Sequence, residues 1–172
     1  MTSTSLATSC PTFEDLSVGQ SIEPLRHGPM LPPHLMRWSA AIENWHRIHY
    51  DVPFATGHDG LPGLLINGSW KQHFVLQVLR RWVGTEGWVW KVDFQFRGMN
   101  MVGETLTAWA EITALTDCDD FGLVELRTGI VNQDDVESTP GTATVIVPKA
   151  GGRAVPYDRA AVLDDLSARL SS

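Results

Sequence analysis

Histidine is concentrated in one stretch of this chain. Three of the six histidines, His46, His49 and His58, lie within residues 46–67, which also carry several prolines and glycines. A neutral imidazole titrates near physiological pH and can take up or release a proton during a reaction. A long segment of this composition inside a small domain is usually disordered or functional. Because this one also contains Phe54 and several leucines, we expect an ordered, functional loop packed on the core.

A second stretch of possible chemical importance is Asn67-Gly68-Ser69, directly before an apolar segment. The apolar residues of that segment predict a helix from about Gly68 to Val83, and Gly84 is well placed to end it. They occupy most of the helix circumference, which indicates a helix wrapped by other structure. Backbone N–H groups in the first turn of a helix favour negative charge.

Two further elements precede the loop. Residues 13–20 form a short segment that ends in a turn, and we expect a short strand there. Apolar residues then recur at helical spacing from Leu35 to Trp45, which predicts a helix over about 33–44. Pro33 fits the first turn of that helix, where its missing N–H costs nothing.

Residues 87–148 have the pattern of strands. A mainly aromatic face, which we assign to the core, is formed by Trp88, Trp90, Val92, Phe94 and Phe96. It alternates with Val89, Lys91, Asp93, Gln95 and Arg97. Lys91 and Arg97 then lie on the solvated face. Three further strands are predicted over 104–116, 121–133 and 142–147, with turns at 117–120 and 134–141. This close spacing implies antiparallel hairpins.

This order of elements predicts an α+β fold: a single hot-dog domain, in which an antiparallel sheet wraps around a central buried helix. Such a sheet covers only part of the helix and leaves an edge strand exposed, so we expect a dimer built on a two-fold axis. The domain is predicted to span 12–150. It follows a disordered leader at 1–11 and precedes a tail at 151–172 with a short helix at about 157–171.

Composition narrows the functional classes. The chain has 172 residues, 43% of them hydrophobic and 19% charged, and a net charge of -7. This acidity argues against a nucleic-acid surface, which needs a basic face. Cys10 and Cys118 have no metal-ligating neighbours at a useful spacing, so we expect free thiols in a reducing cytoplasm, no metal site and no cofactor. We also expect no signal peptide and no membrane span.

The strings around His49 and Gly68 resemble a known family, the MaoC-like (R)-specific enoyl-CoA hydratases. That family carries Gly-Asp-x-Asn-Pro-x-His, followed by a loop and a His-Gly pair that opens the central helix. His49 falls on the signature histidine, and Ile66-Asn67-Gly68 falls on the Val-His-Gly stretch. Asp51 and the following Phe54-Ala55 also fit. The string from 46 to 51 more specifically resembles the mesaconyl-CoA hydratase-like branch.

The resemblance implies the addition of water across an α,β-unsaturated acyl thioester, or its removal. In this reading His49 is the base and the Gly68 N–H stabilises charge at the thioester oxygen. The chain departs from the family at Asn44, which falls on the catalytic aspartate and has no titratable group. Asn44 would then orient the water or His49. Glu43, one residue off the family spacing, is the less favoured acid.

Several other candidate residues each have two possible interpretations. Arg47 fits the carboxylate of a dicarboxylic acyl-CoA, or pairs with an acid at the surface. His46 binds substrate or is a surface residue, and Asn67 binds substrate or caps the helix. Gly68 either donates its backbone N–H to the oxyanion or is needed only for close packing. Arg97 lies on a solvated face from which it can reach a CoA phosphate.

Three functions compete at this stage. The first is an acyl-CoA hydratase or dehydratase with His49 as base. The second is a non-catalytic MaoC-like subunit that shapes the acyl pocket of another hot-dog subunit, which Asn44 favours. The third is a hot-dog thioesterase that aims Glu43 or Asp51 at the thioester carbon. In each case we expect acyl-CoA as the small-molecule partner, and a homodimer or a heteromer with another hot-dog subunit.

Overall fold

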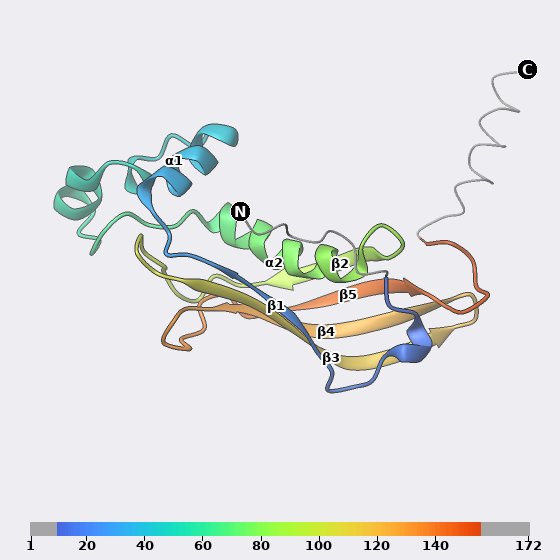
Figure 1. Ribbon diagram of the computed structural model, residues 1–172. Coiled ribbons are helices and arrows are strands. Elements are labelled where there is room, and N and C mark those ends of the chain that lie inside the picture. Colours follow the sequence, from blue (N-terminus) through green and yellow to red (C-terminus); the bar gives the residue numbers. More distant parts are fainter. Residues whose placement is uncertain (1–9, 156–172) are drawn as a thin grey trace, which may run out of the picture.

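The computed structural model describes residues 10–155, so residues 1–9 of the predicted leader at 1–11 and the predicted helix at 157–171 lie outside the described residues. Two α-helices, five strands and three short helical turns form the fold (Figure 1). The helices are α1 (Pro32–Ala41) and α2 (Gly68–Val83), and the short turns are η1 (Phe13–Asp15), η2 (Arg47–His49) and η3 (Phe54–His58). The strands are β1 (Ser21–His27), β2 (Trp88–Phe94), β3 (Leu106–Cys118), β4 (Phe121–Val131) and β5 (Gly141–Pro148).

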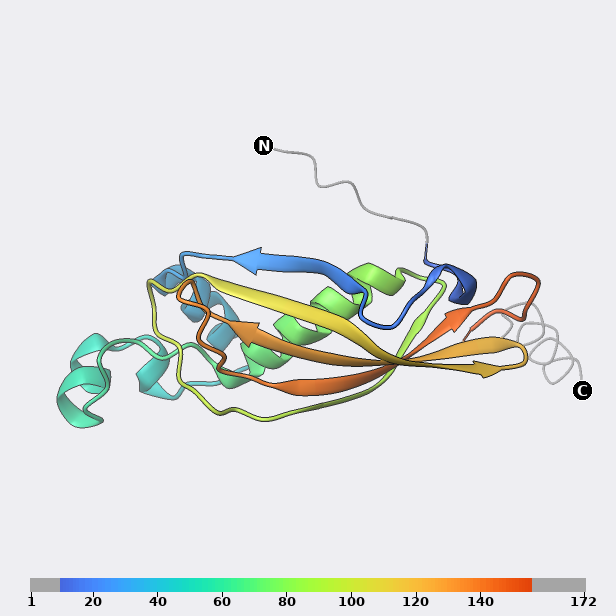
Figure 2. The same cartoon turned by 90° about the horizontal axis from the view of Figure 1, so that it is seen from below.

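The five strands form one antiparallel sheet in the order β1-β3-β4-β5-β2. Strands β3, β4 and β5 are joined by the two predicted hairpins. Strand β2 crosses over to pair with β5, so β1 and β2 are the two edges. Figure 2 shows α2, in green, running across one face of this sheet. The predicted α+β arrangement of sheet and central helix is therefore confirmed.

The core lies between α2 and the sheet. Phe74, Val75, Val78 and Leu79 on α2 are almost fully buried. They pack with the inward side chains of the strands, such as Ile112, Leu126 and Val145. The other side of α2 carries exposed polar residues, including Gln72 and Gln77. Within the described chain the sheet thus covers one side of the helix and does not enclose it.

Both predicted helices are present. Helix α2 has the predicted bounds and ends at Gly84, whose φ of 59° is a left-handed value that glycine adopts without steric cost. Helix α1 begins with Pro32 and Pro33 in its first turn, as expected from Pro33, and ends three residues before the predicted limit of 44. Trp45 therefore lies beyond the helix and is 57% exposed.

The position predicted for the first strand is wrong. Residues 13–20 contain the turn η1 and a second turn, and the strand is β1, which begins at Ser21. Pro24 interrupts this strand, and its register with β3 shifts between Ile22 and Leu25. Proline is tolerated there because β1 is an edge strand, where one side of the backbone makes no ladder bonds.

The aromatic face predicted for the strand at 88–96 is also wrong. Trp88, Trp90 and Phe96 are 40%, 62% and 52% exposed. The register of β2 against β5 shifts between Val89 and Lys91, so Val89 pairs with the buried Val145 and, after the shift, Val92 pairs with the buried Ala143. A bulge of one residue reverses which side chains face the core, and this one turns Trp88 and Trp90 outward. Lys91 and Arg97 are exposed as expected.

Candidate active site

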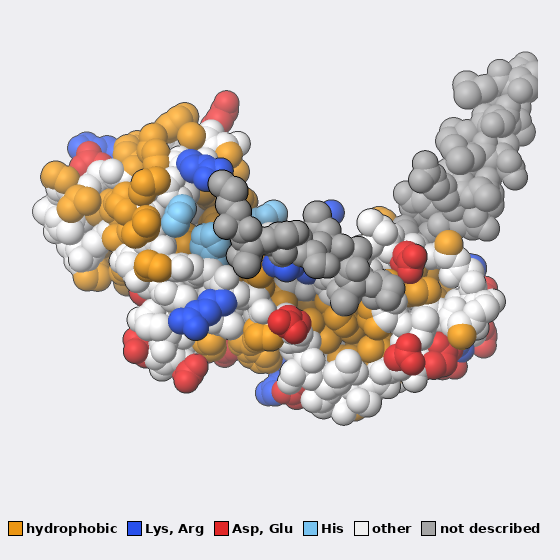
Figure 3. Space-filling model, in the orientation of Figure 1, with side chains coloured by type: hydrophobic (Ala, Val, Ile, Leu, Met, Phe, Trp, Pro, Cys, Tyr) orange, Lys and Arg blue, Asp and Glu red, His pale blue; other side chains and the backbone are white. Residues whose placement is uncertain are grey.

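The segment between α1 and α2 is ordered and projects beyond one end of the sheet (Figure 1). It folds into the turns η2 and η3 and returns to the core through Leu64 and Ile66, both 2% exposed. Hydrophobic side chains gather over α1 and this segment, with histidines beside them (Figure 3). The large exposed hydrophobics of this region are Leu31, Met36, Ile42, Trp45 and Val52. The prediction of an ordered loop packed on the core is confirmed.

His49 ends η2 and is buried, with 6% of its surface exposed. Its Nδ1 lies 2.8 Å from the carbonyl oxygen of Leu65. Because a carbonyl can only accept, Nδ1 carries the hydrogen and Nε2 keeps a free lone pair. Burial lowers the pKa of His49, while the bond to Leu65 acts in the opposite direction and the nearby His46 adds to the lowering. The ring is therefore held neutral, in the tautomer that a base requires.

The opening of α2 is built by a short chain of hydrogen bonds. The Oδ1 atom of Asn67 accepts from the Ser69 backbone N–H at 3.1 Å and from the Ser69 hydroxyl at 2.6 Å. That hydroxyl in turn accepts from Trp38 Nε1 on α1 at 2.9 Å. Asn67 therefore caps the helix, as one of its two readings predicted, and these donors fix which end of its amide is oxygen.

The other end of the same amide has no partner. Asn67 is 3% exposed, and among residues 10–155 nothing accepts a hydrogen bond from its Nδ2 atom. Leaving a buried donor unsatisfied costs about 1–3 kcal/mol, so such atoms call for an explanation. The adjacent Gly68 is the first residue of α2, and its N–H has no acceptor inside the helix. Two donors without an acceptor in the helix thus stand side by side.

A hydrogen bond ties His49 to the segment that leads into α2. The carbonyl that holds the imidazole belongs to Leu65, two residues before Asn67. Two residues of extended chain span at most about 7 Å. The backbone carbonyl that holds the His49 ring is thus three residues before Gly68, the predicted oxyanion donor.

Phe96 lies against the start of α2. A Cβ atom added at Gly68 would lie 3.2 Å from the Phe96 ring, so the ring would have to shift slightly to admit any larger residue there. Phe96 is itself about half exposed and follows directly after β2. Both readings of Gly68, an exposed N–H and close packing, are thus compatible with its surroundings.

Asn44 does not contact the His49 ring through its side-chain oxygen. That oxygen accepts from the His46 backbone N–H at 3.1 Å and closes a local turn. The turn begins at Glu43, whose φ of 54° is left-handed and strained for a residue with a side chain. His46 is exposed, and its ring lies 6.2 Å from that of His49.

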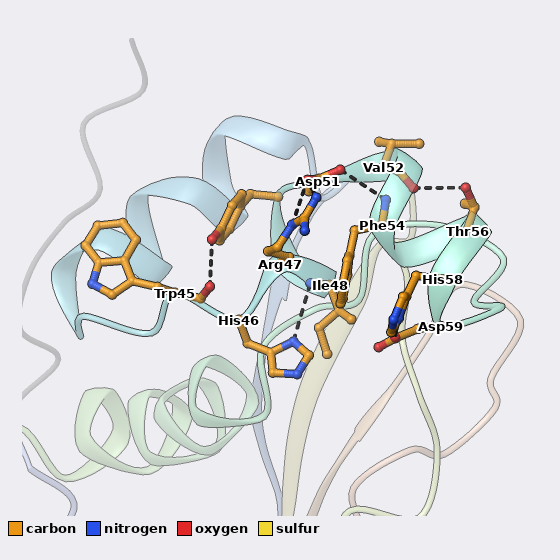
Figure 4. Close-up of polar contacts among 11 residues, drawn as sticks. Trp45, His46, Arg47, Ile48, Asp51, Val52, Phe54, Thr56, His58 and Asp59 are labelled. Atoms are coloured by element: carbon orange, nitrogen blue, oxygen red, sulfur yellow. Dashed lines mark hydrogen bonds and ion pairs between the residues drawn. The ribbon is translucent and has the colours of Figure 1, made fainter.

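Arg47 is engaged with its neighbours on the loop (Figure 4). Its Nη2 and Nε atoms donate to one carboxylate oxygen of Asp51 at 2.7 and 3.0 Å, and its guanidinium lies 4.4 Å from the centre of the Phe54 ring. His58 stacks on the same ring, with centroids 4.5 Å apart. The hydrogen bond from Arg47 lowers the pKa of Asp51, with a smaller contribution from the Phe54 N–H. Arg47 thus has the surface ion pair that one of its two readings predicted.

Sequence analysis missed Lys71, which is 3% exposed in the first turns of α2. Its Nζ donates to the Gly98 carbonyl at 2.8 Å and to Asn100 Oδ1 at 3.2 Å. Burial lowers the pKa of Lys71 to about 8, and the nearby Glu104 carboxylate limits the drop. The available signal was a lysine on a helix whose other residues are mostly apolar. Arg97, by contrast, is exposed, and its backbone N–H bonds to Ser138.

Other kinds of site find no support in the part of the chain that the structure describes. Within residues 10–155, no group of three His, Cys, Asp or Glu side chains is placed to hold a metal ion. In the same range, no helix is long and apolar enough to cross a bilayer. Two hollows of about 270 and 350 Å³ lie elsewhere, one over the strand residues around Thr142 and one beside Pro24 and Val78.

Comparison with known proteins decides the family. Residues 17–104 match the family described as hydroxyacyl-thioester dehydratase type 2, and the match covers just over half of the chain. The chain belongs to this family. The matched range includes the histidine loop, the opening of α2 and the segment after β2, so every candidate site residue discussed above lies within it.

One curated relative and several solved structures add detail. Mesaconyl-C(4)-CoA hydratase from Chloroflexus aurantiacus is 41% identical over 49 residues, which are 28% of this chain and only 18% of that protein. The (R)-hydratase of A. caviae involved in PHA biosynthesis has a TM-score of 0.70 at 23% identity, over 78% of this chain and 99% of its own. A MaoC-like dehydratase from Rhodospirillum rubrum has a TM-score of 0.70 at 18% identity, covering 81% and 98%.

The ChsH1-ChsH2 complex from Mycobacterium tuberculosis is also similar, with a TM-score of 0.66 at 17% identity, over 76% of this chain and 98% of the matched one. At these identities the structures establish the fold, a single hot-dog domain. The MaoC-like resemblance inferred from the sequence is thereby confirmed.

Proposed function

We propose that this dehydratase-family protein adds water to, or removes it from, an α,β-unsaturated acyl thioester, with His49 as the base. The observation that carries this proposal is the bond from His49 Nδ1 to Leu65, which leaves Nε2 free to accept a proton and ties the ring to the segment that leads into α2. The family supports the reaction class, and the bond that holds the His49 ring supports the choice of base.

In the hydration direction, Nε2 takes a proton from water while the water oxygen bonds to Cβ of the thioester. The electron pair of the Cα–Cβ double bond moves toward the carbonyl, and negative charge collects on the thioester oxygen. The Gly68 N–H and Asn67 Nδ2 are two donors for that oxygen, and the positive end of the α2 dipole adds to them. The imidazolium of His49 then returns its proton to Cα.

Asn44 has a supporting part in this scheme. Its Oδ1 holds the turn that leads into η2, so it sets the path of the backbone just before His49. Its amide nitrogen is a hydrogen-bond donor that can orient the attacking water. Because an amide cannot exchange a proton, His49 must serve as both base and acid.

For the acyl group, we propose a dicarboxylic acyl-CoA with Arg47 near its free carboxylate. Arg47 is about half exposed and lies two residues from His49, and its guanidinium already holds one carboxylate, that of Asp51. A substrate carboxylate would share or replace that partner. His46, whose exposed ring lies 6.2 Å from that of His49, joins Arg47 on the proposed acyl side. Arg97 is exposed where it can reach a CoA phosphate.

We also propose that a second copy of this chain pairs with strand β2. This edge strand exposes Trp88 and Trp90 together with its unpaired backbone groups, and Phe96 and Met99 follow it, 52% and 62% exposed. An apolar open edge of this kind is a template for pairing with another strand. A partner there would lie beside Phe96 and therefore beside the opening of α2.

The dimer is tested by light scattering on the purified chain. We expect twice the 19.0 kDa chain mass for the wild type, a monomer for Trp90→Lys, and no change for Val18→Lys, an exposed apolar position just before β1 at the opposite edge of the sheet. A monomeric wild type that gains activity only with a second hot-dog protein would point to a heteromer instead.

The reaction is tested by offering the purified protein a set of enoyl-CoA esters. Hydration predicts loss of the enoyl-thioester absorbance without release of free thiol. Free thiol with loss of the ester would establish a thioesterase and remove the proposal. Asp51, one candidate carboxylate for that chemistry, is already held by Arg47 and the Phe54 N–H.

A further inference from the structure

Lys71 is a buried charge that the proposed reaction does not use. It lies three residues after Gly68, at the end of α2 where the helix dipole disfavours a cation. Burying an ammonium is costly unless hydrogen bonds compensate for the lost water. The compensation comes from one segment, the connection between β2 and β3, through Gly98 and Asn100.

Glu104 stabilises that connection through two hydrogen bonds. The Asn100 side chain donates to Glu104 Oε2 at 2.8 Å, and the Met101 backbone N–H donates to Oε1 at 2.7 Å. The ammonium, the amide and the carboxylate thus form a continuous polar row from α2 into the connection. The Phe96 ring also lies 5.2 Å from Lys71 Nζ and touches Gly68.

The same connection holds the residue that orients His49. The Asn100 carbonyl accepts from the Ile66 N–H at 2.8 Å, and Leu65 forms an isolated antiparallel bridge with Met101. Leu65 is the residue whose carbonyl binds Nδ1 of His49. A short path therefore runs from Lys71 through the Asn100–Met101 backbone to Leu65 and the imidazole.

We propose that Lys71 is a positioning residue, which holds the His49 imidazole and the start of α2 in one fixed arrangement. This inference rests on the proposed function only in that His49 is the group whose position matters for the reaction. Lys71 does not touch the substrate. It ties α2 to the connection between β2 and β3, and that connection in turn holds Leu65, the residue bonded to His49.

The test compares Lys71→Met with Val78→Ala, a core change on the same helix ten residues from Gly68. The first readout is the NMR signal of the His49 ring nitrogens, which reports tautomer and pKa without any substrate. The second is kcat against KM on the best enoyl-CoA ester. For Lys71→Met we expect a mixture of ring tautomers and a kcat roughly 10–100-fold lower with little change in KM. For Val78→Ala we expect a lower Tm, wild-type ring signals and kcat within about twofold.

Asn100→Ala serves if Lys71→Met does not fold, since it removes one acceptor of the ammonium and keeps the backbone bond to Ile66. We expect the same change in the His49 signals, smaller in size. Wild-type ring signals in a folded Lys71→Met or Asn100→Ala protein would overturn the proposal, as would equal shifts in Val78→Ala. If the wild type turns over no enoyl-CoA, the proposed function fails, while the ring signals still decide the role of Lys71.

Discussion

The opening of α2 and the loop η2–η3 both carry polar residues, but they hold them in different ways. At the opening, the bonds join residues far apart in sequence: Trp38 to Ser69, Lys71 to Gly98 and His49 to Leu65. On the loop, the bonds run between near neighbours, such as Arg47 to Asp51 and His58 to Asp59.

The difference indicates which residues are fixed for chemistry. Buried bonds between distant segments are part of the fold and are lost only when packing is lost. Exposed ion pairs within four residues are weak and exchange readily with other partners. This difference supports the proposal that the reacting groups are His49 and the opening of α2, and that the loop around Arg47 selects the substrate.

Replacing His49 with alanine is the strongest test of the residues that are held by buried bonds between distant segments. We expect kcat to fall by about 10²–10⁴, the usual contribution of a positioned general base. The assay is the loss of enoyl-thioester absorbance, with circular dichroism to verify folding. His58→Ala, on the loop, is the matched histidine control and should change kcat less than threefold. An unchanged rate in His49→Ala would remove the assignment of the base.

Replacing Asn67 separates its two roles. Asn67→Asp keeps an oxygen that caps Ser69 and removes the Nδ2 donor, so we expect stability near that of the wild type and kcat lower by roughly 10²–10³. Asn67→Ala removes the cap as well and should cost about 1 kcal/mol in unfolding free energy. Full activity in Asn67→Asp would show that Nδ2 does not serve the thioester oxygen.

The pH dependence of kcat/KM reports on His49. Because burial lowers its pKa, the neutral base persists below about pH 6.5, and activity should fall about tenfold per pH unit only below that lowered value. The contribution of this histidine to stability is likewise present above about pH 6.5 and lost as the pH falls through its folded-state pKa. If kcat/KM already falls to half its maximum at a pH above 6.5, the result would contradict the burial of the ring.

Replacing Arg47 with alanine tests the loop. We expect roughly fivefold lower kcat/KM on dicarboxylic acyl-CoA esters and less than twofold on simple ones, because the contact is exposed. Asp51→Asn frees Arg47 from its present partner and should shift the preference toward dicarboxylic esters. Equal losses on both substrate types in Arg47→Ala would count against a carboxylate contact.

The sequence alone predicted the secondary structure correctly where several local signals agree. Asn67 and Gly84 mark the two ends of α2, and both ends were placed correctly. The prediction of the strands failed where a single residue changes the pairing register. The bulge at Trp90 reverses the alternation of β2, and the register of β1 shifts beside Pro24. Neither register shift can be recognised from the alternation of apolar and polar residues in the sequence.

For the site, spacing and resemblance placed His49, Asn67 and Gly68 in one region. They could not reveal that the Asn67 amide keeps a free donor or that His49 is bonded to Leu65, because both depend on which backbone segments meet. Lys71 was missed since a lysine on a helix is ordinarily read as solvent-facing. Only the connection after β2, which supplies its acceptors, makes burial possible.

The convergence of base and donors is tested most directly by a crystal structure with a bound saturated acyl-CoA thioester. We predict the thioester oxygen about 2.7–3.1 Å from both the Gly68 nitrogen and Asn67 Nδ2. We also predict His49 Nε2 within reach of one water molecule from Cβ. A thioester seated away from the first turn of α2, or an imidazole whose Nε2 faces the protein core, would contradict the account.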